Sequence, residues 1–241
     1  MARGMRERLR PRGISRAFAF LKTKERILIM REVYQGQLEN LHVELIQMGG
    51  LCERAISAAA KTMMVNNEKL VDEVHQLENE IDHKERDIES LCMKMIIRQQ
   101  PVASDFRLIS AALKMISDME RIGDQACDIV DITKDIRDTK MLESMPIRDM
   151  ADATVRMLTD SVDSFVRSDI DLAQKVMEAD DYVDGKFLQI REELVALLSA
   201  EPEKSSEAMD FLMIAKYYER IGDHAVNIAE WVEYSITGVK R

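Results

Sequence analysis

The feature that most constrains the fold is a five-residue segment that occurs twice. The sequence Glu-Arg-Ile-Gly-Asp stands at residues 120–124 and again at 219–223, 99 positions later. The helix-breaking residues Pro101 and Pro202 repeat at a similar spacing of 101 positions. A period of this length indicates a duplicated structural unit of about 100 residues. The 241-residue chain is therefore expected to fold as two related halves.

Apolar residues in both halves recur every three or four positions, as they do on one face of an amphipathic helix. No segment alternates with the period of two that is typical of a strand, and only 5% of the residues are aromatic. Ser104 or Asp105 is expected to cap the third helix. The helices are predicted to cover residues 33–66, 68–98, 104–136, 147–167, 169–198 and 205–234. In the third of them the predicted packing stripe comprises Phe106, Ile109, Leu113, Ile116, Met119, Ile122, Ala126 and Ile129.

Short connections between successive helices make neighbours antiparallel. We therefore predict an all-α fold of six long helices, arranged as two tandem antiparallel three-helix bundles related by a pseudo-twofold axis. The first bundle is expected over residues 31–138 and the second over residues 139–241. Residues 1–30 are a basic extension, either a disordered tail or a short amphipathic helix, and Met30 is an alternative start of the protein.

The charge of the chain is unevenly distributed. The net charge is −10, but residues 1–31 hold ten Arg or Lys and two Glu, which leaves −18 for the remaining 210 residues. A body this acidic argues against nucleic acid as a partner and suits cations or basic protein surfaces. The three cysteines lack metal or disulfide spacing, and no apolar run is long enough to span a membrane. We expect a cytoplasmic protein.

The repeated segment supplies a candidate metal site in each half. Residues four apart lie on one helix face, so each copy places a glutamate beside an aspartate. Neighbouring helices carry similar pairs, and converging carboxylates repel one another unless a cation lies between them. Oxygen ligands favour Mg, Ca or Mn, and iron is also possible. The predicted metal ligands are Glu78, Asp82, Glu120, Asp124 and Asp128 in the first half and Asp180, Asp184, Glu219, Asp223 and Asn227 in the second.

Two alternatives remain at this point. The acidic pairs are solvated helix faces in a plain scaffold, or the chain is a ferritin-like carboxylate metal-binding bundle. The ferritin-like alternative needs paired Glu-x-x-His motifs. Only Glu39 and His42 fit that spacing, with Asp72 and His75 as an imperfect second pair. No phosphate-binding glycine loop and no catalytic triad is present, so we predict that the chain is not an enzyme.

Several motifs in the same order resemble the PhoU family. They are RQQPVASD at 98–105, MERIGD at 119–124, MGGL at 48–51 and YERIGDHA at 218–225, and the resemblance spans residues 30–234. The resemblance implies the two-bundle fold and metal clusters on the acidic stripes, with Asn227 weakening the second site. The metal ions implied are divalent or trivalent, with iron, zinc, manganese and magnesium as candidates. The glycines, Gly123 and Gly222, are expected to let a helix or an ion cluster approach closely.

The same resemblance implies a function. PhoU-like proteins are accessory proteins of phosphate-specific transport, and they act as negative regulators of phosphate uptake and of the phosphate-starvation response. The partners implied are the ATPase subunit of the phosphate ABC transporter and a phosphate-sensing histidine kinase. We also expect a homodimer that is peripheral to the membrane through its partners and binds no nucleic acid.

Overall fold

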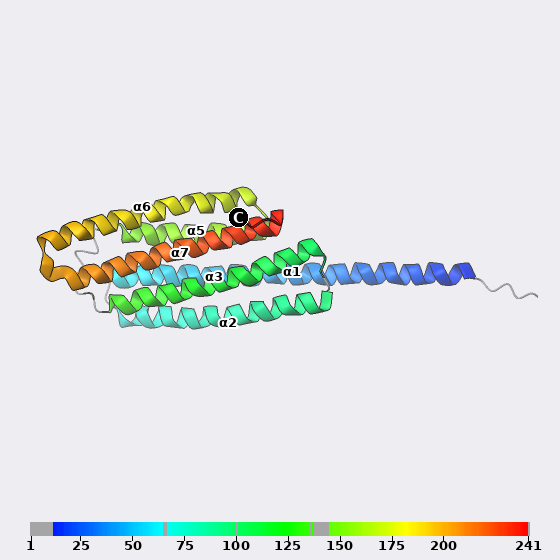
Figure 1. Ribbon diagram of the computed structural model, residues 1–241. Helices are drawn as coiled ribbons and strands as arrows, with labels where there is room; N and C mark the ends of the chain where they lie inside the picture. The colour runs from blue at the N-terminus through cyan, green and yellow to red at the C-terminus, as the bar shows by residue number, and fades with distance from the viewer. Residues whose placement is uncertain (1–11, 65–66, 100, 135, 137–144, 241) are drawn as a thin grey trace, which may run out of the picture. The chain divides into compact units, whose positions relative to one another are not determined.

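The computed structural model describes residues 12–64, 67–99, 101–134, 136 and 145–240, with side chains described from residue 31 onward except that of Gln99. All regular structure in these residues is helical, as predicted (Figure 1). The chain divides into two compact units, Met1–Asn40 and Leu41–Arg241. The elements are α1 (Arg12–Met64), α2 (Glu68–Gln99), α3 (Ala103–Thr133), α5 (Ile147–Arg167), α6 (Ile170–Ala200), the short 3-10 helix η1 (Pro202–Lys204) and α7 (Ser205–Thr237).

The first unit contains the N-terminal part of α1, which is helical from Arg12. The sequence placed the start of this helix near residue 33. The helix therefore begins earlier than predicted, and it runs through residue 30 without a break. Residues 1–11 lie outside the described residues, as does most of the predicted link at 138–146.

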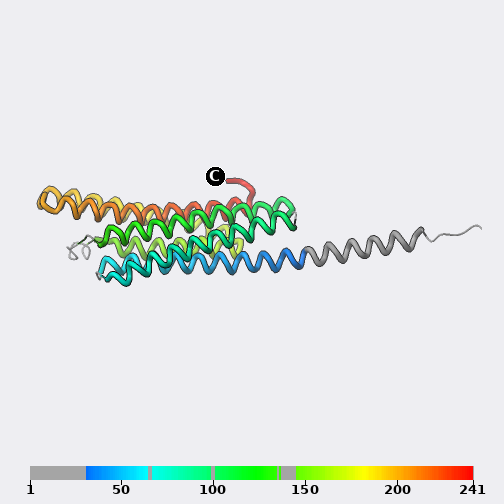
Figure 2. Tube along the Cα trace, turned by 90° about the horizontal axis from the view of Figure 1, so that it is seen from below, coloured from blue at the N-terminus to red at the C-terminus, as the bar shows by residue number. Residues whose placement is uncertain are grey.

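The second unit contains the bundle. Here α3 packs against α2 and α7, while α5, α6 and α7 pack against one another. Figures 1 and 2 show α3 and α7 side by side, with α2 on the far side of α3 and α6 on the far side of α7. The part of α1 within this unit joins both halves, because Cys52 contacts Met119 on α3 and Glu53 accepts a hydrogen bond from Thr159 on α5.

The core consists of the predicted apolar stripes. The stripe predicted for α1 is fully buried except for the half-buried Leu38, and its buried members are Leu41, Leu45, Met48, Cys52, Ala55 and Ala59. The stripe predicted for α3 is buried from Ile109 onward except for the partly exposed Leu113. The prediction was wrong for Phe106, which is 49% exposed. Phe106 lies in the first turn of α3, and the C-terminal end of α7 lies against its neighbour Arg107 instead.

The predicted cap of α3 was also wrong. The helix begins at Ala103, with Val102 in the cap position and no side-chain hydrogen bond there. In the second half, by contrast, the Asp169 carboxylate accepts a hydrogen bond from the Leu172 backbone N–H at 3.0 Å and caps α6. No helix in the described part of the chain combines the length and hydrophobicity needed to cross a bilayer.

The seam between α3 and α7 shows the twofold relation between the repeats. The Asp118 carboxylate on α3 lies 2.9 Å from His224 Nδ1 and accepts a hydrogen bond from Asn227 at 3.2 Å. Farther along the seam, Asp128 on α3 interacts with the hydroxyl of Tyr217 on α7. Asp118 and Tyr217 occupy equivalent positions in the two repeats, as do Asp128 and Asn227. The two contacts are therefore related by the antiparallel crossing of α3 and α7.

Candidate metal centre: two carboxylate clusters

The structure brings together four of the predicted residues in the second repeat. Asp180 and Asp184 come from α6, and Glu219 and Asp223 come from α7. We call this set the repeat-two cluster. Burial raises the pKa of Asp180 to about 6, with further increases from the charges of Asp184, Asp223 and Glu219. Burial and the neighbouring Glu219 likewise raise the pKa of Asp223. These shifts show that the four carboxylates lie close enough to repel one another.

Gly222 explains how Asp180 reaches the cluster. A Cβ atom at position 222 would lie 3.1 Å from Asp180 Oδ1 and 3.5 Å from Val183 Cγ1. The same Asp180 Oδ1 atom is buried and has no hydrogen-bond partner in the described part of the chain. An unpaired buried carboxylate oxygen is costly. It is also the kind of atom that a bound cation satisfies.

One cation of the protein contacts the repeat-two cluster. Lys216, three residues before Glu219 on α7, donates to both carboxylate oxygens of Glu219. Its ammonium group also lies 5.4 Å from the centre of the Phe187 ring. No ion pair to Asp180, Asp184 or Asp223 is present among the described residues. Lys216 therefore offsets only part of the charge of this cluster.

The first repeat contains the matching set. Glu78 and Asp82 on α2 and Glu120 and Asp124 on α3 form the repeat-one cluster. Burial raises the pKa of Glu78, and the charges of Asp82 and Asp124 raise it further. Burial, followed by the charge of Asp124, raises the pKa of Glu120. The four predicted residues thus converge in this repeat as well.

Arginines distinguish the repeat-one cluster from its counterpart. The Arg121 guanidinium lies 3.4 Å from a Glu120 oxygen and 2.9 Å from an Asp124 oxygen. Arg86 contacts Asp82 at 3.0 Å. These two exposed arginines contact three of the four carboxylates and offset part of their charge. The repeat-two cluster has no such arginine contacts within the described residues.

Glu85 is a member of this region that the sequence prediction missed. It accepts a hydrogen bond from Ser117 on α3 at 3.2 Å, and its charge contributes to raising the pKa of Glu120. A signal was present in the sequence, because Glu85 follows Asp82 by three residues on the same helix face. The equivalent position in the second repeat is Phe187, so the repeat alone did not point to it.

The remaining predicted ligands, Asp128 and Asn227, do not complete their clusters. Asn227 bonds to Asp118 across the α3–α7 seam, and Asp128 interacts with Tyr217 there. Each step of four residues turns the side chain by about 40° around the helix. Asp128 and Asn227, two steps along, therefore lie about 80° from the first residue of each set and turn from one neighbouring helix toward the other. The expectation that Asn227 weakens the second site stays a prediction.

The fit of these residues to a metal ion differs between the repeats. In the described part of the chain, no group of three or more His, Cys, Asp or Glu side chains is already arranged as a metal site. The repeat-two cluster nevertheless offers carboxylate oxygens, one of them buried and unpartnered, which suits a hard cation. The His75 ring contacts Asp131 at 3.2 Å rather than a carboxylate cluster, so it gives the ferritin-like alternative no support.

The comparison with known domains decides the family. The model of the PhoU domain matches residues 45–133 and again residues 147–232. The chain belongs to the PhoU family. Two copies of the PhoU domain in tandem correspond to the two helical repeats, and the predicted fold class is confirmed.

Proteins named as PhoU homologues are similar over most of this chain. The phosphate-specific transport system accessory protein PhoU homolog of Clostridium acetobutylicum is 33% identical over 210 residues, which cover 86% of this chain and 96% of that protein. The PhoU homolog of Aquifex aeolicus is 36% identical over 190 residues, which cover 76% and 84%. This PhoU family includes transport accessory proteins rather than enzymes.

Solved PhoU structures have the same fold. The crystal structure of PhoU from Pseudomonas aeruginosa superposes with a TM-score of 0.78 at 31% identity. The superposition covers 86% of this chain and 100% of that chain. A phosphate transport system regulatory protein PhoU from Streptococcus pneumoniae has the same TM-score, 0.78, at 20% identity. At that identity the second likeness supports the fold alone.

Proposed function

We propose that this chain is an accessory protein of phosphate-specific transport, which restrains phosphate uptake and represses the phosphate-starvation response. The observation that carries this proposal is the match of both repeats to the PhoU domain, together with 33% identity over 96% of a relative named for that role. The protein acts without catalysis, through binding. Its partners are the ATPase subunit of the phosphate ABC transporter and a phosphate-sensing histidine kinase, on the cytoplasmic side of the membrane.

The charge of the body supports an adaptor role. Residues 32–241 carry a net charge of −18, and carboxylates are densest along α2. Such a surface attracts basic segments of partner proteins and accelerates their association. In this account the long helices hold two separated acidic surfaces at fixed positions, so that one molecule can engage two partners or two copies of one partner.

A binding experiment with purified components tests the adaptor role. The chain is immobilised and the transporter ATPase subunit is titrated over it at low and high salt concentration. We expect saturable binding that weakens as salt screens the acidic surface. Absence of binding at low salt would argue against this partner while leaving the metal proposal untouched.

We propose further that the clusters bind divalent or trivalent metal ions, and that the repeat-two cluster binds them more tightly. The support is the buried, unpartnered Asp180 Oδ1 and the absence of arginine contacts to this cluster in the described residues. A bound cation would relieve the repulsion among the carboxylates without displacing a guanidinium. Iron, manganese, magnesium and zinc are the candidates, and the all-oxygen donor set favours the first three.

Elemental analysis after reconstitution tests the metal proposal. We expect the Glu219→Ala/Asp223→Ala protein to lose more metal than the Glu120→Ala/Asp124→Ala protein. The matched control is Glu68→Ala/Asp72→Ala, an exposed pair with the same spacing on α2 outside both clusters. Wild-type protein that stays free of metal after reconstitution would contradict the proposal.

A further inference from the structure

A pocket lies between the two repeats, and its lining includes none of the cluster residues. It has a volume of about 500 Å³ and is formed by the C-terminal end of α1 and the N-terminal half of α5. Volumes of this order are typical of sites for small organic molecules. Because one wall belongs to each repeat, a ligand in this pocket would contact both halves of the protein at once.

The pocket has a cationic rim. Lys61 enters from α1 and Arg148 from α5. Both are exposed, and within the described part of the chain neither forms an ion pair with a carboxylate. This is unusual for Arg148, because Asp152 stands four residues later on the same helix face. Two unpaired cations from different helices are available to a ligand, within a body whose net charge is strongly negative.

The start of α5 adds to the positive potential of this rim. The helix begins at Ile147, and Pro146 in the cap position provides no side-chain cap for its free backbone N–H groups. Unpaired N–H groups and the helix dipole make such an end favourable for phosphate groups. Asp149, the acidic residue of this first turn, lies 3.5 Å from Lys186 on α6 and is offset by it.

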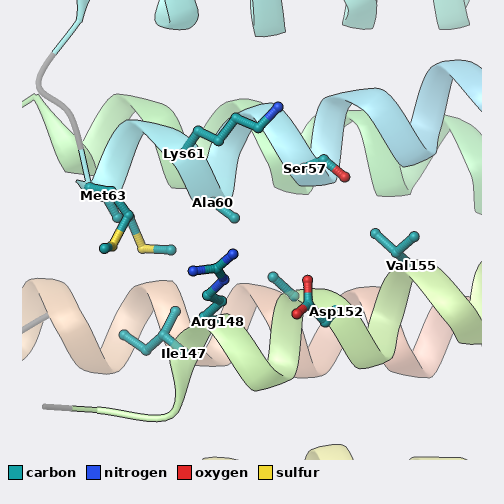
Figure 3. Close-up of a pocket in the computed structure, with 10 residues that line it drawn as sticks. Ser57, Ala60, Lys61, Met63, Ile147, Arg148, Asp152 and Val155 are labelled. Carbon is teal, nitrogen blue, oxygen red and sulfur yellow. The ribbon is translucent and has the colours of Figure 1, made fainter. Parts of the chain in front are cut away.

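Part of the pocket wall is apolar. Met63 on α1 lies across from Ile147 on α5, and Val155 on α5 lies at the other end of the pocket, across from Ser57 (Figure 3). Figure 3 shows the side chains of Arg148 and Asp152 pointing from α5 toward α1, with Met63 pointing the other way and Lys61 extending along α1. Cations at the rim and apolar walls together suit a molecule with one anionic end and an apolar body. The pocket is also larger than an inorganic phosphate ion requires.

We propose that this pocket binds a small organic phosphate, whose phosphate group contacts Arg148, Lys61 and the N-terminus of α5 while its apolar part packs against Met63, Ile147 and Val155. Bidentate contacts of Arg with phosphate oxygens are among the strong hydrogen bonds in proteins. Asp152 sets the orientation, because its carboxylate repels the phosphate group from its own end of the pocket. The site is distinct from the carboxylate clusters and does not depend on the proposed transport role.

Titration calorimetry at low salt with three probes tests this site. Phenyl phosphate carries both features that the pocket recognises, inorganic phosphate carries only the charge, and phenol carries only the apolar part. We expect saturable binding of phenyl phosphate at least about tenfold tighter than binding of either of the other two, since each lacks half of the contacts. Equal affinity for phenyl phosphate and inorganic phosphate, or no saturable binding of phenyl phosphate, would overturn the proposal.

Variants of the protein test whether phenyl phosphate binds in this pocket. The Lys61→Gln/Arg148→Gln protein is expected to bind phenyl phosphate at least about tenfold more weakly, because both charge-assisted contacts are lost. The matched control, Lys175→Gln/Arg191→Gln, removes two exposed cations of α6 and should leave the affinity unchanged. Asp152→Asn should bind more tightly, since it removes a repulsive charge. Wild-type affinity in the Lys61→Gln/Arg148→Gln protein would place the probe elsewhere and refute the site.

Discussion

At the scale of single residues, the two copies of the repeated segment perform different tasks. A Cβ atom at Gly123 would lie 3.1 Å from Ile81 Cδ1, so this glycine allows α2 and α3 to pack closely. A Cβ atom at Gly222 would lie 3.1 Å from an oxygen of Asp180, so the second glycine makes room for a carboxylate. The sequence predicted both possibilities, a helix or an ion cluster. The sequence could not show which glycine has which role, because the role depends on the residue that each glycine faces on the neighbouring helix.

The raised pKa of Asp180 has a consequence for stability. Its ordinary value is 3.8 and its folded value is about 6, so the folded protein binds this proton more tightly than the unfolded chain does. The charged form is therefore disfavoured in the folded state by burial and by Asp184, Asp223, Glu219 and Asp181. Stability from this group is full at low pH and is lost as the pH rises from about 4 to about 6.

The Asp180→Asn variant tests this linkage. In the absence of metal it should be more stable than the wild type at neutral pH, and its advantage should shrink as the pH falls toward about 4. Thermal unfolding in the presence of a chelator measures the difference, with the exposed Asp160→Asn as the control. A difference between variant and wild type that does not change with pH would contradict the account.

The close approach of Asp180 to Gly222 gives a second prediction at this scale. Gly222→Ala should displace the Asp180 carboxylate and weaken metal binding at the repeat-two cluster by about tenfold, as changes beside metal ligands commonly do. Gly123→Ala adds the same methyl group against Ile81 in the other repeat and serves as the matched control. Titration with Mn²⁺ measures both affinities. Equal effects of the two substitutions on the tighter site would show that Gly222 has no special role.

At the scale of elements, α3 and α7 each have neighbours on two sides. The acidic stripe of α3 begins against α2 at Glu120 and ends against α7 at Asp128. A pattern along one helix shows which residues share a face. It does not show where contact with one neighbouring helix ends and contact with the next begins. This is why the stripe alone did not show that Asp128 and Asn227 lie at the α3–α7 seam.

Asp118 is expected to be the main polar contact of the α3–α7 seam. Its carboxylate contacts both His224 and Asn227, and its side chain is only 16% exposed. Asp118→Ala leaves both partners without their acceptor and should lower the free energy of unfolding by about 2 kcal/mol. Chemical denaturation, compared with the exposed Asp160→Ala, measures the loss. A change no larger than that of the control would show that the seam is held by apolar packing alone.

At the scale of the whole molecule, most of the fold prediction came from the duplication in the sequence. The repeated segment and the apolar stripes predicted six helices, their order and the twofold relation, because these follow from local periodicity and short connections. Two features could not be predicted in this way. The exposure of Phe106 and the pocket beside Arg148 depend on packing between distant segments.

The central claim is that this PhoU-family chain represses the phosphate-starvation response. The most direct measurement is the expression of a phosphate-starvation reporter in a Pseudomonas aeruginosa strain that lacks its own PhoU and produces this chain instead. In excess phosphate, the account predicts that the wild-type chain restores repression, while a stable chain carrying Glu219→Ala/Asp223→Ala restores less. A reporter that stays fully active although the wild-type chain is folded and abundant would contradict the claim.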